Sequence, residues 1–309
     1  MTAPLQPLEE QALEELRYAL AQSHTQRPPV ALRQRVLQAA ITARPPGVAT
    51  GTGPPITPIE AYLRTVSSLD ALLSQLTDDE WHRPVLRDLD IQGLIGHLIG
   101  VEVQLHAAIG LGPPVATSPD HVASTQAEAL AQAGRLPRQT HAQWAGLVGQ
   151  TVEYAATLGP DEAMRAVTLH TFTIPLPRML VVRAFETWTH EEDIRRATDR
   201  PLSSPDPARL RLMTELAVSA LPRGLATIGR RQPGRSARII LTGPGGGTWQ
   251  VALDRGQAGP ADVRIVADAV SFCRFVANRL PQVELAVSAT GDSTLAADIL
   301  AGAPTVALD

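Results

Sequence analysis

The stretch RMLVVRAFETWTHEEDIRRAT, residues 178–198, decides how this chain folds. Its apolar residues occupy nearly every side of a helix, and such a helix is usually buried among other helices. Glu186 and His190 lie four residues apart, so they share one face of it. A carboxylate on a buried face needs a partner, because an unpaired charge there is costly. A divalent metal ion would satisfy both groups, and a simple hydrogen bond or ion pair is the alternative.

A second apolar helix offers the complementary ligand. The sequence IQGLIGHLIGVEVQLHAAIGLG follows the N-cap residue Asp90 and carries His97 at the edge of its apolar side. Two imidazoles and one carboxylate form a complete protein ligand set for a catalytic zinc site, with a further position left open. Helical bundles commonly build metal sites from facing helices. We therefore predict a metal site of His97, Glu186 and His190, with a hydrogen-bonded core histidine as the alternative for His97.

Other polar residues lie near these three. Glu102 and His106 are also four residues apart, but they point about 140° and about 180° away from His97 at about 100° per residue. We expect them to form a local ion pair or an interface contact. Asp193 is a candidate acceptor for an imidazole N–H of His190, and an exposed pair with Arg196 is the alternative.

Composition narrows the class of protein. The chain has 309 residues, 44% of them hydrophobic, and a net charge of −4, so it shows no basic footprint for nucleic acid. No apolar run approaches the length that spans a bilayer, and the N-terminus lacks a signal pattern. Cys273 is the only cysteine, which excludes an internal disulfide and cysteine-based zinc fingers. It follows an apolar helical pattern, so we expect it to be buried and unreactive. A cytoplasmic protein without membrane partners is the simplest interpretation.

Three parts follow one another along the chain. Residues 1–50 are expected to form a helical N-terminal appendage and linker. The Pro- and Gly-rich sequence RPPGVATGTGPPIT separates the helical part from the rest of the chain. Residues 56–199 contain four long helical segments, enough for a four-helix bundle. Residues 201–309 alternate helices with strand-like runs and predict a small α+β domain. Within it, the PGGG turn of LTGPGGGTWQ predicts a hairpin rather than a phosphate-binding loop.

Two segments carry a family resemblance. LTDDEWHRPVLRDLDIQGLIGHLIGVE and TIPLPRMLVVRAFETWTHEEDIRRATDRP resemble the two metal-binding helices of the DinB-like, mycothiol-dependent maleylpyruvate isomerase superfamily. The region after residue 201 is similar to its sterol-carrier-like α+β domain. The resemblance covers about residues 56–309 and implies a DinB-like four-helix bundle followed by that domain. It also implies that His97, Glu186 and His190 bind a divalent metal, usually zinc, beside a cleft for a low-molecular-weight thiol.

The resemblance further implies a catalytic arginine late in the second domain. Arg279 is the closest match, although the chain has Asn278 before it where the family has glycine. Arg274, one helical turn earlier, is the alternative. Such an arginine would hold a substrate carboxylate through two hydrogen bonds.

The implied function is that of a zinc-dependent isomerase or S-transferase that uses mycothiol or a similar thiol. A metal-activated thiolate would add to a small electrophilic substrate. Two alternatives remain open. One is a metal-assisted enzyme that uses no thiol. The other is a non-catalytic, anti-sigma-like regulatory protein that binds a protein partner through residues 1–43, because PPVALRQRVLQAA resembles the helical tails of actinobacterial anti-sigma factors.

Overall fold

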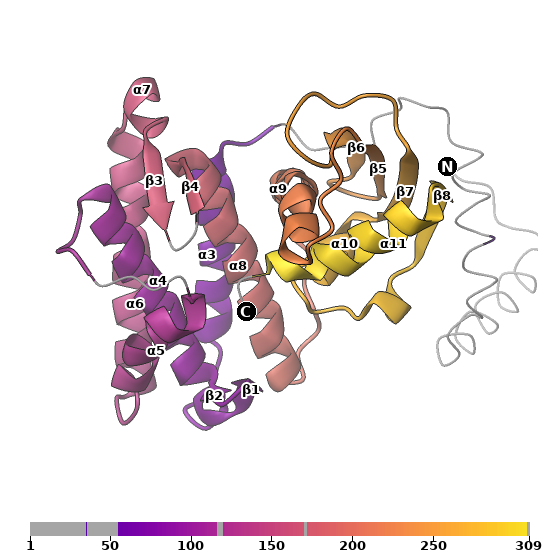
Figure 1. The fold of residues 1–309 in the computed structure, drawn as a ribbon. Helices are drawn as coiled ribbons and strands as arrows, with labels where there is room; N and C mark the ends of the chain where they lie inside the picture. Colours follow the sequence, from indigo (N-terminus) through magenta and orange to yellow (C-terminus); the bar gives the residue numbers. More distant parts are fainter. Residues whose placement is uncertain (1–34, 36–54, 116–119, 170–171, 308–309) are drawn as a thin grey trace, which may run out of the picture. The chain divides into compact units, whose positions relative to one another are not determined.

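The computed structural model describes residue 35 and residues 55–115, 120–169 and 172–307 (Figure 1). The chain divides into two units, Met1–Val48 and Ala49–Asp309. The predicted appendage and its partner-binding segment therefore lie outside the described residues, except for Arg35. Within the part of the chain that is described, no helix is long and apolar enough to cross a membrane.

The first part of the second unit is built from long helices. They are α3 (Pro58–Leu73), α4 (Ile91–Ile109), α6 (Pro137–Thr157) and α8 (Leu176–Ala197), with the shorter α5 (His121–Ala131). Helix α3 packs against α8, and α4 packs against both α5 and α6. Figure 1 shows these helices gathered together, which confirms the predicted helical bundle.

Short elements connect the long helices. They are η1 (Glu80–His82), β1 (Pro84–Leu86), β2 (Leu89–Asp90), α7 (Pro160–Ala163), β3 (Ala166–Leu169) and β4 (Phe172–Pro175). Strands β1 and β2 pair antiparallel before α4, and β3 and β4 pair antiparallel before α8. Each pair therefore leads the chain directly into one of the two helices with predicted metal ligands.

Helix α4 begins where its sequence predicts and ends at Ile109, three residues before the end of the predicted stretch, residues 91–112. The Asp90 carboxylate accepts a hydrogen bond from the Gly93 backbone N–H at 2.7 Å, which caps the N-terminus. Gly110 ends the helix with φ of 84°, a conformation that glycine adopts without steric cost. Almost every residue between these ends is buried, because α4 packs against helices on several sides.

Two glycines of α4 let α5 approach closely. A Cβ atom at Gly96 would lie 2.8 Å from Ala129 Cα and 3.0 Å from the Glu128 carbonyl oxygen. A Cβ atom at Gly100 would lie 3.0 Å from Thr125 Cβ. At either position a Cβ atom would come too close to α5 unless the helices moved apart. The observed spacing between α4 and α5 therefore requires glycine at both positions. This spacing brings the first turn of α5 next to His97.

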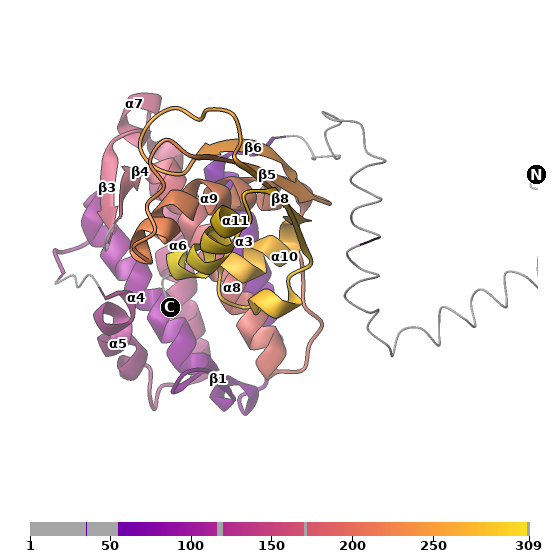
Figure 2. The same ribbon diagram turned by 45° about the vertical axis from the view of Figure 1, so that its right-hand side comes forward.

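The remaining residues form a small α+β domain. Its elements are α9 (Pro207–Thr227), β5 (Ser236–Thr242), β6 (Gly247–Ala252), β7 (Val263–Asp268), α10 (Ala269–Val276), η2 (Gln282–Glu284), β8 (Val287–Gly291), α11 (Ser293–Gly302) and η3 (Ala303–Val306). The sheet order is β6-β5-β7-β8, with β5 and β7 parallel and the other pairs antiparallel. Figures 1 and 2 show α9, α10 and α11 side by side next to this sheet.

The structure confirms the predicted fold class of a helical bundle followed by an α+β domain. The glycine-rich turn joins β5 to β6 in a hairpin, as expected. Cys273 is fully buried in α10, and burial raises the pKa of its thiol, so it is unreactive as predicted. The domain boundary near residue 200 stays a prediction; α8 ends at Ala197 and α9 begins at Pro207.

Replacing Gly96 by alanine tests the close approach of α4 and α5. The added methyl group meets backbone atoms of α5, and such overpacking costs about 1–3 kcal/mol, against a gain of up to about 1 kcal/mol from helix propensity. We expect a net loss of stability in chemical denaturation.

Gly146→Ala in α6 is the matched control, because nothing lies within 4 Å of a Cβ atom there. It should leave stability unchanged or raise it. Equal effects of the two substitutions would contradict the packing argument.

Candidate metal centre

Three side chains from three helices converge inside the bundle. The Glu186 Oε1 atom of α8 lies 3.3 Å from His97 Nε2 of α4 and 3.0 Å from His121 Nε2 of α5. The three candidate ligand atoms all lie within 4.8 Å of one another. Both histidines are buried and Glu186 is nearly so, with 11% of its side chain exposed. The cluster therefore has the residue types and the spacing of a metal site.

His97 has a hydrogen-bond partner at each ring nitrogen. His97 Nδ1 lies 2.7 Å from the Thr125 hydroxyl oxygen, and Nε2 lies 3.3 Å from Glu186 Oε1. The hydroxyl can donate to Nδ1, or it can donate to the backbone carbonyl of His121 or Val122, each at 3.1 Å, and accept from Nδ1–H. The second arrangement leaves the Nε2 lone pair of a neutral His97 available to a metal ion.

The electrostatics keep His97 neutral and Glu186 charged. Burial lowers the pKa of His97 to about 4, even though the hydrogen bond to Glu186 opposes this shift. Burial raises the pKa of Glu186, but the charge of Arg183 and the contacts with His121 and His97 outweigh it, so that pKa lies well below its ordinary value. A neutral imidazole and a charged carboxylate therefore lie 3.3 Å apart, and these are donor types that a divalent cation would bind.

His190 lies beside this cluster rather than within it. Its ring centroid is 5.4 Å from that of His97, and the two planes are nearly perpendicular. His190 Nδ1 lies 3.2 Å from Asp193 Oδ2, and a carboxylate only accepts, so Nδ1 carries the proton. His190 Nε2 is buried and has no hydrogen-bond partner among the described residues. An unsatisfied buried imidazole nitrogen is the kind of group that a metal ion would satisfy.

A buried arginine holds the other oxygen of Glu186. Arg183 Nη1 contacts Glu186 Oε2, and Arg183 Nε and Nη2 donate to Glu102 Oε1 at 3.1 and 3.0 Å. Glu102 also accepts from the hydroxyls of Tyr62 and Thr151, at 2.6 and 2.8 Å. Arg183 therefore leaves Oε1 of Glu186 directed at the histidines.

Glu102 and His106 do not form the expected local ion pair. Both residues contact the Thr151 hydroxyl, which donates to Glu102 and accepts from His106 Nε2 at 2.9 Å. The carboxylate pairs with Arg183 of α8 instead. Helical angle alone missed this partner, because the long arginine side chain reaches Glu102 from a neighbouring helix.

Both candidate arginines of the second domain bind carboxylates of α8. Arg279 donates to Asp193 at 2.8–3.1 Å, and Arg274 donates to Glu192 at 3.0 Å. Asp193 contacts His190 as expected and also pairs with Arg196, but it is buried rather than exposed. Arg279 is thus connected to His190 through Asp193, whereas Arg274 holds the neighbouring carboxylate.

A pocket opens beside these residues. Glu186 and His190 of α8 line it together with Leu216 and Arg223 of α9 and Val276 of α10. Most of its wall is apolar, and two of the predicted ligands face into it. A small molecule in this pocket would lie next to the candidate metal centre, which is the usual position of a substrate site.

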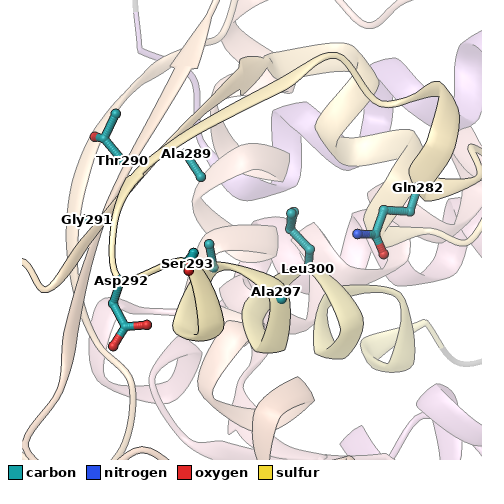
Figure 3. A pocket seen from close by; sticks show the side chains of 9 residues that line it. Gln282, Ala289, Thr290, Gly291, Asp292, Ser293, Ala297 and Leu300 are labelled. Atoms are coloured by element: carbon teal, nitrogen blue, oxygen red, sulfur yellow. The ribbon is translucent and has the colours of Figure 1, made fainter.

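A second pocket lies at the start of α11 (Figure 3). Gln282, Thr290 and Asp292 line it, and its lining includes no histidine or cysteine. The Asp292 carboxylate caps α11 and pairs with Arg235, so it is already used in the fold.

The sequence predicted His97, Glu186 and His190 as ligands but not His121. His121 follows a loop rich in proline and serine, GPPVATSPD, whose position in space no local pattern predicts. A signal was present in the glycines at positions 96 and 100, one helical turn apart on either side of His97. Such a pair indicates that another helix approaches closely, and α5 is the next helix in the chain.

The fold and the buried His–Glu cluster define a helical-bundle protein with a candidate metal centre and an attached α+β domain. Residues 62–195 match the family model described as mycothiol maleylpyruvate isomerase N-terminal domain. This match confirms the resemblance seen in the sequence.

Two crystal structures resemble the chain. One is a mycothiol-dependent maleylpyruvate isomerase and the other is a histidine-to-alanine mutant of such an isomerase. Each is 16% identical and matches over 75% of this chain and 91% of the other, with TM-scores of 0.53 and 0.52. At that identity the likeness shows the shared fold. No curated protein matches this chain in sequence.

The depressed pKa of His97 predicts how stability depends on pH without metal. The folded protein binds fewer protons than the unfolded chain, so this contribution is present above pH 6.5 and is lost as the pH falls towards about 4. The loss amounts to up to about 3 kcal/mol. Urea unfolding across this range measures it, and His97→Asn, which cannot titrate there, should flatten the decline. If the stability of His97→Asn falls with pH as steeply as that of the wild-type protein, the decline does not come from His97.

The two domain-crossing arginines allow a matched comparison. Arg279→Gln removes a hydrogen-bond donor from Asp193, which orients His190, so we expect metal affinity to fall about 10–100-fold. Arg274→Gln removes a donor from Glu192 and should leave the affinity nearly unchanged. Competition with a chelating dye measures both. Equal losses of metal affinity in the two variants would show that attachment of the second domain in general, rather than the contact with Asp193, controls metal binding.

Proposed function

We propose that this chain is a thiol-dependent metalloenzyme that isomerises a small electrophilic alkene, with mycothiol or a similar thiol as cosubstrate. The family match over residues 62–195 supports this class of function. The observation that carries the proposal is the buried pair of His97 Nε2 and Glu186 Oε1, an imidazole nitrogen and a carboxylate oxygen 3.3 Å apart. His190 Nε2, buried beside them without a hydrogen-bond partner in the described part of the chain, supports it further.

These residues fit a divalent metal ion. His97, Glu186 and His190 supply two imidazole nitrogens and a carboxylate oxygen, the donor types that zinc takes in catalytic sites. Thr125 and Asp193 each hold the second nitrogen of one imidazole, as outer partners of metal-bound histidines commonly do. A bound divalent cation would favour the thiolate form of a thiol and so supply the nucleophile at neutral pH.

The pocket would hold the reacting molecules. Its apolar wall, with Leu216 and Val276, excludes water from the carbon skeleton of a substrate. The thiolate adds to the activated double bond, forming a C–S bond and leaving a C–C single bond that can rotate. Expulsion of the thiolate breaks the C–S bond and restores the double bond in the other geometry. Thiolate is regenerated, and no proton or electron is gained or lost overall.

The same nucleophile could instead displace a leaving group and give S-transfer. The described side chains around the site favour isomerisation, because the groups that contact the cluster are already used. Thr125 donates to a backbone carbonyl and Asp193 is held by Arg279, so neither is available to protonate a leaving group. We therefore place isomerisation before S-transfer.

Metal analysis of the purified protein is the first test. We expect about one equivalent of a divalent metal, and a large loss in His97→Ala and Glu186→Ala. His141→Ala is the control, because His141 pairs with Asp70 on the outside of the bundle. Absence of metal from the wild-type protein, even after incubation with zinc, would overturn the proposal.

Calorimetry with mycothiol is the second test. The zinc-loaded protein should bind mycothiol, the metal-free protein should bind it at least about 10-fold more weakly, and maleylpyruvate should be isomerised only when the thiol is present. Activity without any thiol would favour a thiol-independent metalloenzyme. Metal binding with neither thiol binding nor turnover would favour the regulatory alternative.

A further inference from the structure

We propose that His121 is an additional protein ligand of this metal, so that three imidazoles and one carboxylate surround the ion. The inference rests on the proposed function, since it needs the metal site. It changes the chemistry of that site, because four protein ligands close the position that a three-ligand zinc site leaves open to solvent.

The position of His121 carries the inference. Its Nε2 atom lies 3.0 Å from Glu186 Oε1, nearer than the predicted ligand His97 at 3.3 Å. The ring centroids of His121 and His97 are 4.8 Å apart and their planes are nearly perpendicular, so the two rings meet edge to face. The side chain of His121 is also buried, with 4% exposed.

Helix α5 holds His121 in this place through several contacts. Asp120 caps the helix by accepting from the N–H groups of Val122 and Ala123, which fixes the first turn. Thr125, one turn later, is hydrogen-bonded to His97 Nδ1 at 2.7 Å. The same turn of α5 thus orients one ligand and supplies another, and Gly100 gives it room to do both.

Binding of an ion changes the role of His121. In the structure one proton between His121 Nε2 and Glu186 Oε1 accounts for their 3.0 Å separation. His121 would hold a divalent cation through the Nε2 lone pair, with its one ring proton on Nδ1, because a ligating imidazole nitrogen carries no proton. A thiol would then have to compete with His121 for the ion.

Nuclear magnetic resonance of histidine-labelled protein tests this directly. The chain has eight histidines, and long-range proton–nitrogen spectra distinguish a metal-bound imidazole nitrogen from one that carries a proton. On addition of one equivalent of zinc, we expect the Nε2 signals of His97, His121 and His190 to shift together. If His97 and His190 shift while His121 keeps an Nε2–H, then His121 is only a donor to Glu186 and the inference fails.

Metal affinity provides the second measurement. His121→Ala should weaken zinc binding by more than about 100-fold, beyond the 10–100-fold that follows loss of an outer partner. His121→Asn, which keeps a polar side chain, guards against a folding defect, and His141→Ala is the control for loss of a histidine elsewhere. A loss below about 10-fold in both His121 variants would overturn the inference. Absence of any zinc effect in the wild-type protein would instead overturn the proposed function.

Discussion

The candidate site depends on a neutral imidazole and a charged carboxylate that are buried side by side. Thr125 holds Nδ1 of His97, and burial keeps that imidazole neutral 3.3 Å from the Glu186 carboxylate. His190 Nε2, which has no hydrogen-bond partner among the described residues, lies close by. Proteins rarely bury such an arrangement without a compensating ligand, because the desolvation of unsatisfied polar groups is costly.

Much of the fold was predictable because its signals are local. Asp90 caps the start of α4, and the glycine-rich turn marks a hairpin. These patterns follow from hydrogen bonding and backbone sterics within a few residues. The spacing of Glu186 and His190 likewise places both on one face of α8. The assignment of the three predicted residues as ligands stays a prediction that the geometry supports.

The missing parts of the site depend on contacts between distant segments. His121 reaches the cluster because α5 packs on the glycines of α4, and Arg183 joins Glu102 to Glu186 across two helices. Nothing within a few residues of either side chain fixes such a contact. The same holds for Arg279, whose resemblance to a catalytic residue did not indicate that it binds Asp193. The second domain therefore contributes to the orientation of His190 as well as to the pocket wall.

The buried network around Arg183 also bears on which molecules the proposed metal centre would accept. Glu102 and Glu186 carry two negative charges and Arg183 carries one positive charge, so this group alone has an excess of one negative charge. A bound dication would reverse the sign and leave an excess of one positive charge. Since a net charge in a low-dielectric interior is costly, one monoanion would bring the centre to neutrality. The thiolate of the proposed cosubstrate would satisfy that balance, whereas a neutral thioether or a dianion would not.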